Sequence, residues 1–195
     1  SMFYALAAAD ARPLAKAIAD TTARPQTAQW GMFLRNHDEL DLGRLSEKQR
    51  QTVLNEMGPD KSMQLYDRGI RRRLAPMLKG DRRRLELAYS LMFSLPGTPV
   101  IRYGDEIAMG DDLSLPERNC ARTPMQWSAA PYGGFSTGVP WIEVNPNYTT
   151  VNADAAMTDE QSVWNHYRKL IALRKTHPVI VYGTYQSWLD QHLSL

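Results

Sequence analysis

Three consecutive side chains, Asn36, His37 and Asp38, could do chemistry, because an amide, an imidazole and a carboxylate follow an apolar run at residues 30–34 with only Arg35 between. A short apolar run of this kind is typical of a buried β-strand. In α/β barrels and open α/β sheets, functional side chains lie at the carboxyl ends of the parallel strands. The pattern therefore predicts a strand whose C-terminal end carries an imidazole and a carboxylate into a site.

A second strand is expected at residues 100–103, which run into Gly104, Asp105 and Glu106. A turn signal at residues 96–99 precedes it. The residues between the two strands show helical patterns, as a parallel βα crossover requires, so we expect an α/β fold. Capping patterns and apolar periodicity predict helices at residues 2–20, 46–57, 61–79, 81–95 and 158–175.

These segments resemble a known family. Residues 33–39 resemble the fourth sequence region of the α-amylase family, glycoside hydrolase family 13, and residues 96–107 resemble its eighth barrel strand with the following loop. Residues 122–127 are similar to a motif of its α-glucosidase and trehalose synthase branches. Glu39, Leu40 and the Arg-rich insertion after them look most like trehalose synthases, since hydrolysing α-glucosidases usually carry Gln in place of Glu39.

The resemblance implies the C-terminal portion of a (β/α)8 TIM barrel. Residues 1–176 would supply the last two strands and their helices, and residues 177–195 would begin a C-terminal β domain with strands at 179–182 and 184–188. A whole barrel needs about 250 residues. The family's Gly-x-Arg-x-Asp nucleophile motif and its general-acid glutamate do not occur here. We therefore expect a fragment that is inactive alone and self-associates through exposed barrel edges.

The resemblance also assigns roles to individual side chains. Retaining glycoside transfer uses two carboxylates, and Asp38 would be a third, catalytic one that stabilises the distorted sugar ring by accepting its hydroxyl hydrogen bonds. His37 and Arg122 would bind the same sugar. Glu39 and Asp41 would line the acceptor side, or else be solvated loop carboxylates. Without the resemblance, a strand-end aspartate that caps a turn would be the simpler reading of Asp38.

The remaining charged clusters have structural interpretations. Asp105 and Glu106 are expected to hold their loop through hydrogen bonds and ion pairs. Asp111 and its neighbour lack the spacing of a calcium loop. The arginine runs at 71–73 and 82–84 are interleaved with apolar helix positions, which favours solvated helix surfaces over a nucleic-acid patch.

Composition excludes several classes. A net charge of +2 over 195 residues argues against a polyanion-binding protein. The single Cys120 excludes an internal disulfide and a cysteine-rich metal site. The apolar runs are too short for a membrane span, and the N-terminal residues lack the basic leader of a signal peptide, so a cytoplasmic protein is expected.

We therefore expect part of a retaining enzyme that acts on an α-linked glucose disaccharide or oligosaccharide, most like trehalose synthase, without cofactor or metal, nucleic acid or membrane partner. An α-glucosidase- or α-amylase-type hydrolase is the alternative within the family. A non-catalytic carbohydrate-binding protein is the alternative from another class, and an Arg-rich nucleic-acid module is a third.

Overall fold

The computed structural model describes residues 1–21, 23, 25 and 27–186. Its helices are α1 (Met2–Ala8), α2 (Arg12–Asp20), α3 (Glu47–Met57), α4 (Leu74–Met77), α5 (Arg82–Ser94), α6 (Ala153–Thr158), α7 (Val163–Thr176) and α8 (Val179–Tyr182). Its strands are β1 (Gly31–Met32), β2 (Leu40–Asp41), β3 (Gln64–Leu65), β4 (Gly69–Ile70) and β5 (Thr98–Pro99). Its 3-10 turns are η1 (Lys61–Met63), η2 (Asp105–Ile107), η3 (Glu117–Ala121), η4 (Pro131–Gly134) and η5 (Pro146–Thr149).

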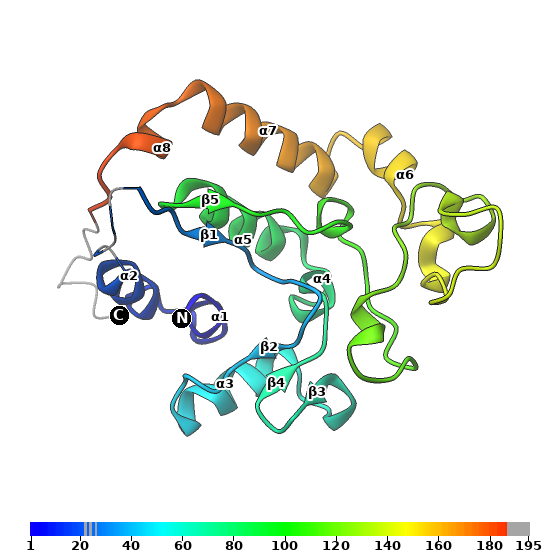
Figure 1. Cartoon of the computed structure of the whole chain (residues 1–195), viewed down its shortest axis with the longest axis horizontal. Coiled ribbons are helices and arrows are strands. Elements are labelled where there is room, and N and C mark those ends of the chain that lie inside the picture. The colour runs from blue at the N-terminus through cyan, green and yellow to red at the C-terminus, as the bar shows by residue number, and fades with distance from the viewer. Residues whose placement is uncertain (22, 24, 26, 187–195) are drawn as a thin grey trace.

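The first expected strand is present as β1, whereas the strand predicted at residues 100–103 is not formed there: the partner of β1 is β5, at residues 98–99, inside the predicted turn. The two strands are parallel neighbours. Gly31 of β1 lies opposite Thr98 of β5. The Thr98 amide donates to the Trp30 carbonyl at 2.7 Å, and the Val100 amide donates to the Met32 carbonyl at 2.8 Å. β1 is shorter than predicted, and residues 100–103 follow β5 without strand structure, because only the Val100 amide continues the pairing with β1. Figure 1 shows β1 and β5 side by side, with α7 above them and a long loop system leading away from the end of β5.

A second sheet lies next to β1 in the sequence. Strand β4 pairs antiparallel with both β2 and β3, in the order β2-β4-β3. Within the described residues neither sheet closes into a barrel. The α/β class is confirmed, while the complete barrel to which the two parallel strands would belong is not formed by these residues.

The main hydrophobic core lies among α1, α3, α4, α5 and α7. Tyr167 of α7 packs on Tyr89 and Phe93 of α5, with ring centroids 4.5 and 5.5 Å apart. Because burial of one large apolar side chain contributes about 1.5–3 kcal/mol, this core fixes α5 and α7 against each other. Its most deeply buried members include Val53, Met57, Ile70, Leu74, Met77, Leu78, Leu85, Ala88 and Tyr89.

Two helix predictions are confirmed by their caps. Ser46 accepts a hydrogen bond from the Gln49 amide, and the Gln49 side chain accepts one from the Ser46 amide, which completes the capping box of α3. Asp81 caps α5 by accepting from the amides of Arg83 and Arg84 at 2.9 and 3.2 Å.

The predictions of one helix at 2–20 and another at 61–79 are wrong. Ala9 adopts a left-handed conformation (φ 51°) and separates α1 from α2. Residues 64–70 form the β3–β4 hairpin, whose turn residues Tyr66 and Asp67 also have positive φ. The rest of that segment contains the 3-10 turn η1 and the short helix α4, which carries Pro76 in its first turn, where proline is tolerated.

The C-terminal predictions also need correction. Thr158 ends α6 and does not open the next helix; α7 is capped by Ser162, which accepts from the Asn165 amide at 3.2 Å. Residues 179–182, predicted as a strand, form the short helix α8. The second predicted strand, at 184–188, lies partly outside the described residues, and its described part is not a strand. The assignment of residues 177–195 to a β domain stays a prediction.

Candidate functional site

The segment after β1 is held by a buried arginine. Arg35 is 2% exposed; its Nη2 donates to the Asp38 carbonyl at 2.6 Å and its Nε donates to the Arg72 carbonyl at 2.9 Å. Burial lowers the pKa of Arg35 to about 10, so the guanidinium stays charged at neutral pH. The Asp38 amide also donates to Asn36 Oδ1 at 3.0 Å. The tripeptide that the sequence singled out is therefore a fixed turn, beyond the strand itself.

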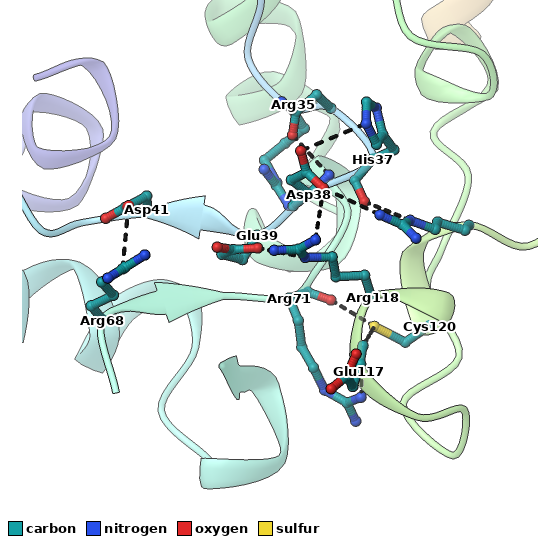
Figure 2. Close-up of polar contacts among 12 residues, drawn as sticks. Arg35, His37, Asp38, Glu39, Asp41, Arg68, Arg71, Glu117, Arg118 and Cys120 are labelled. Carbon is teal, nitrogen blue, oxygen red and sulfur yellow. Dashed lines mark hydrogen bonds and ion pairs between the residues drawn. The ribbon is translucent and has the colours of Figure 1, made fainter. Parts of the chain in front are cut away.

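The carboxylate of Asp38 meets two guanidinium groups. Its Oδ1 lies 3.2 Å from Arg122 Nη2 and 3.3 Å from Arg118 Nη1. Its Oδ2 lies 3.6 Å from Nε2 of the exposed His37 ring. Arg122 also donates from Nε to the His37 carbonyl at 2.9 Å, so it holds both the backbone and the carboxylate of the turn. Figure 2 shows the groups converging on Asp38.

Glu39 belongs to the same cluster, through Arg118. Its side chain is 8% exposed and accepts a hydrogen bond from Arg118 Nε at 2.7 Å. This hydrogen bond is the main reason that the pKa of Arg118 is raised. Arg118 further lies 5.5 Å from the centroid of the Tyr66 ring. The structure thus brings Asp38, His37, Glu39 and Arg122 together and adds Arg118.

Asp41 does not join this cluster. Its carboxylate lies 3.3 Å from Arg68 Nε and accepts from the Gly43 amide at 2.7 Å. Figure 2 shows the Asp41–Arg68 pair apart from the contacts around Asp38. These contacts favour the interpretation of Asp41 as a solvated carboxylate, which lies at the end of β2, over one that lines the acceptor side.

A buried charge cluster lies after β5. Asp105 Oδ1 is 3.5 Å from Nη1 of the fully buried Arg73, which also donates to the Tyr103 carbonyl at 3.0 Å. Arg102 is buried as well and donates to the Ala121 carbonyl. Burial raises the pKa of Asp105 to about 6 and lowers the pKa of Arg102 to about 10. The expectation that Asp105 holds its loop is confirmed by these contacts.

The prediction of a solvated helix surface at residues 71–73 is wrong. Arg71 donates to the carbonyls of Leu113, Leu115 and Glu117 at 2.8–2.9 Å, while its own carbonyl accepts from Cys120 Sγ (Figure 2). Arg72 lies 3.2 Å from the buried Asp111 carboxylate. These arginines hold the loop that contains η3, and η3 positions Arg118 and Arg122. The run at 82–84 does lie at the exposed start of α5.

Sequence reasoning missed Arg118. The signal that could have indicated it is its spacing of four residues from Arg122, which places the two arginines at the beginning and the end of η3. The resemblance predicts a site role for Arg122 alone, whereas the structure brings both guanidinium groups to Asp38. Both reach the same carboxylate oxygen because η3 is short and tightly wound.

The described part of the chain shows neither a cluster of metal ligands nor a membrane-spanning helix. It contains no group of three or more His, Cys, Asp or Glu side chains arranged to hold a metal ion. None of its helices combines the length and the apolar character needed to cross a bilayer.

The family follows from a match to known proteins. Residues 70–183 match the family model of the alpha amylase catalytic domain. The chain therefore belongs to the α-amylase family, glycoside hydrolase family 13.

Proteins of curated name that match this chain support the same family assignment. The chain is 42% identical over 181 residues to a trehalose synthase/amylase of Mycolicibacterium smegmatis, covering 89% of this chain and 30% of that protein. It is 41% identical over 186 residues to a Thermus thermophilus trehalose synthase, covering 92% of this chain and 19% of that protein. An oligo-1,6-glucosidase of Parageobacillus thermoglucosidasius is 55% identical over 73 residues, 37% of this chain and 13% of that enzyme. The chain thus spans less than a third of these relatives.

Solved structures share the fold. A Bacillus licheniformis trehalose-6-phosphate hydrolase superposes with a TM-score of 0.56 at 26% identity, covering 83% of this chain and 30% of that one. An isomaltulose synthase from a Klebsiella species superposes with a TM-score of 0.62 at 24% identity, covering 92% and 33%.

Proposed function

We propose that this chain supplies one wall of the active site of a retaining α-glucoside-acting enzyme of the trehalose synthase type. The observation that carries the proposal is the 3.2 Å contact between Asp38 and Arg122, which are 84 residues apart in the sequence. Residues 1–176 would belong to the barrel part of that enzyme. An α-linked glucose disaccharide or oligosaccharide would be its substrate.

The roles follow from which oxygen of Asp38 is free. Two guanidinium groups hold Oδ1, whereas Oδ2 faces only the His37 ring among the contacts described above. Oδ2 can therefore accept a hydrogen bond from a sugar hydroxyl, and a charge-assisted bond of this kind is roughly twice as strong as a neutral one. His37 Nε2 lies beside that oxygen and could donate to a neighbouring hydroxyl. Asp38 would then act as the transition-state-stabilising carboxylate.

No nucleophile or general acid is assigned within this sequence, because neither family motif occurs in it. Isomerisation rather than hydrolysis is favoured by Glu39, which stands where hydrolysing relatives usually carry Gln, and by the identity to trehalose synthases over most of the chain. The match to oligo-1,6-glucosidases supports the hydrolase alternative over a shorter stretch. An isomerase must exclude water while the released glucose reorients.

The proposal is tested in a chimera in which this chain replaces the matching segment of the Thermus thermophilus trehalose synthase. We expect the chimera to convert maltose into trehalose, and the same chimera with Asp38→Asn to lose at least about a hundredfold in kcat, as loss of a charged group that stabilises a transition state implies. Glucose as the sole product would favour the hydrolase. Sugar binding without turnover would favour the carbohydrate-binding alternative.

The isolated chain provides a second measurement. We expect it to show no turnover of maltose beyond that of its own Asp38→Asn variant, because retaining chemistry needs two further carboxylates. Turnover that depends on Asp38 in the isolated chain would contradict this expectation.

A further inference from the structure

We infer that Arg118 is a positioning residue of this site, anchored by Glu39 and Tyr66 so that it holds the carboxylate of Asp38. The inference rests on the proposed function and refines it. It assigns Glu39 to the support of Arg118, whereas the sequence had suggested that Glu39 lines the acceptor side.

The geometry of Arg118 fits a bridge between two carboxylates. Its Nε donates to Glu39 Oε2 at 2.7 Å, and its Nη1 lies 3.3 Å from Asp38 Oδ1 (Figure 2). The guanidinium is planar and rigid, so an anchor at one nitrogen fixes the direction of the others. A lysine has a single charged nitrogen on a flexible stem and could serve only one of the two carboxylates.

Glu39 is itself held in place. Its side chain packs over Gly69 of β4, where a Cβ atom would come within 2.8 Å of Glu39 Cγ. With only 8% of the side chain exposed and its carboxylate occupied by Arg118, Glu39 is poorly placed to contact substrate. Asp38, at 39% exposed, remains open to solvent. Glu39 therefore contacts Arg118 from the protein interior, and Asp38 contacts it from the solvent side.

Tyr66 supports the guanidinium from the β3–β4 turn. The ring centroid lies 5.5 Å from Arg118 Cζ, within the range of a cation–π contact. Tyr66 has a positive φ of 56°, an unusual conformation for a tyrosine, and this conformation is part of the turn that presents the ring. Two elements from different parts of the sequence thus converge on Arg118.

The kinetic consequence follows from the two oxygens of Asp38. Arg118 and Arg122 both hold Oδ1, so together they orient Oδ2 toward the substrate. Without Arg118 the carboxylate keeps one cation and can rotate. Because Asp38 would act mainly on the distorted sugar of the transition state, the loss should appear in kcat more than in KM.

The test is a double-mutant cycle in the active chimera, on maltose. We expect Arg118→Gln to lower kcat about tenfold or more with little change in KM, and Arg118→Lys to recover part of this loss. We expect Glu39→Gln to lower kcat as well, and the double variant Glu39→Gln/Arg118→Gln to lose no more kcat than Arg118→Gln alone. Arg68→Gln, which breaks the neighbouring Asp41 pair, is the matched control and should leave kcat unchanged.

A raised KM for Glu39→Gln with unchanged kcat, or additive losses in the double variant, would overturn the inference, because Glu39 would then act on substrate by itself. A loss equal for Arg68→Gln and Arg118→Gln would also overturn it.

A second measurement uses the 195-residue chain and does not depend on the proposed function. We expect Arg118→Lys to shift the carbon-13 resonance of the Asp38 carboxylate and Arg68→Gln to leave it in place. We also expect Glu39→Gln to speed exchange of the Arg118 Nε proton. If the chimera is inactive while these spectral changes occur, the proposed function fails and the positioning of Asp38 by Arg118 stands. An unmoved Asp38 resonance overturns the inference itself.

Discussion

Asp105 is a buried carboxylate at the start of η2, in the loop after β5, and it is surrounded by arginines. Arg73 pairs with it directly, and the charges of Arg102 and Arg35 also favour its ionised form. Desolvation outweighs these attractions and raises the pKa of Asp105 to about 6. A group whose pKa is higher in the folded state binds its proton more tightly there than in the unfolded chain, so it stabilises the fold at low pH.

This shift predicts a pH dependence of stability. Between the ordinary pKa of 3.8 and the raised pKa of about 6, the unfolded state binds fewer protons at Asp105, so the free energy of unfolding falls as pH rises. The full shift corresponds to about 3 kcal/mol. We expect the contribution to be complete below pH 4 and lost as pH passes 6, measured by denaturant unfolding from pH 4 to pH 7.5.

The control for this prediction is Asp105→Asn, which keeps the shape of the side chain but cannot titrate. The difference in unfolding free energy between the two proteins isolates the effect of Asp105 from that of other carboxylates. Parallel pH profiles for the two proteins would show that Asp105 does not titrate in this window.

The close approach of β1 and β5 depends on Gly97, the residue directly before β5. Gly97 has a φ of 125°, and a Cβ atom there would lie 2.9 Å from the Trp30 carbonyl oxygen and 2.6 Å from Met32 Cγ. Arg174 of α7 donates to the Gly97 carbonyl at 2.5 Å. The same residue thus sets both the spacing of the parallel strands and the attachment of α7.

We expect Gly97→Ala to lower the free energy of unfolding by about 2–4 kcal/mol, the sum of strain at positive φ and overpacking against β1. Gly80→Ala is the matched control: Gly80 also has a positive φ, of 66°, but nothing lies within 4 Å of its added Cβ. It should cost about 1 kcal/mol. Equal losses in thermal unfolding would mean that contact with β1 contributes nothing.

At the scale of the whole molecule, the two-stranded sheet leaves large apolar side chains in solvent. Isolated exposed apolar side chains are normal, whereas several on neighbouring segments favour association. A two-stranded parallel sheet also leaves unpaired backbone groups at its edges. The exposed side chains on and next to β1 and β5 are Trp30, Phe33, Val100, Ile101 and Tyr103.

The expected self-association remains a prediction that can be measured. We expect the chain to sediment as a concentration-dependent mixture of species, and Val100→Lys to shift this mixture toward monomer by adding charge at the sheet. Val139→Lys is the control, because Val139 is 79% exposed in the loop before η5, at a distance in sequence from either strand. If both variants sediment like the unmodified chain, the sheet does not mediate association.

The sequence by itself determined the features that depend on neighbouring residues. The capping box at Ser46 and the cap at Asp81 use contacts within a few residues, and the structure confirms them. The apolar run before Asn36 does contain β1, but its pairing with β5 joins residues far apart in the sequence. The resemblance to a family predicts that Arg122 belongs to the site. The contact of Arg122 with Asp38 could not follow from local chemistry, since the two residues are 84 positions apart in the sequence.

Tertiary structure decided the rest. The carbonyls of Leu113, Leu115 and Glu117 make Arg71, expected as a solvated surface side chain, a half-buried anchor of the η3 loop, because acceptors from a distant segment replace water around its guanidinium. The β3–β4 hairpin replaced a predicted helix because β2 offers an antiparallel partner. Arg118 lies in the site because of contacts between distant segments. Glu39, Tyr66 and Asp38 contact it only in the folded chain, and no short-range sequence pattern predicts these contacts.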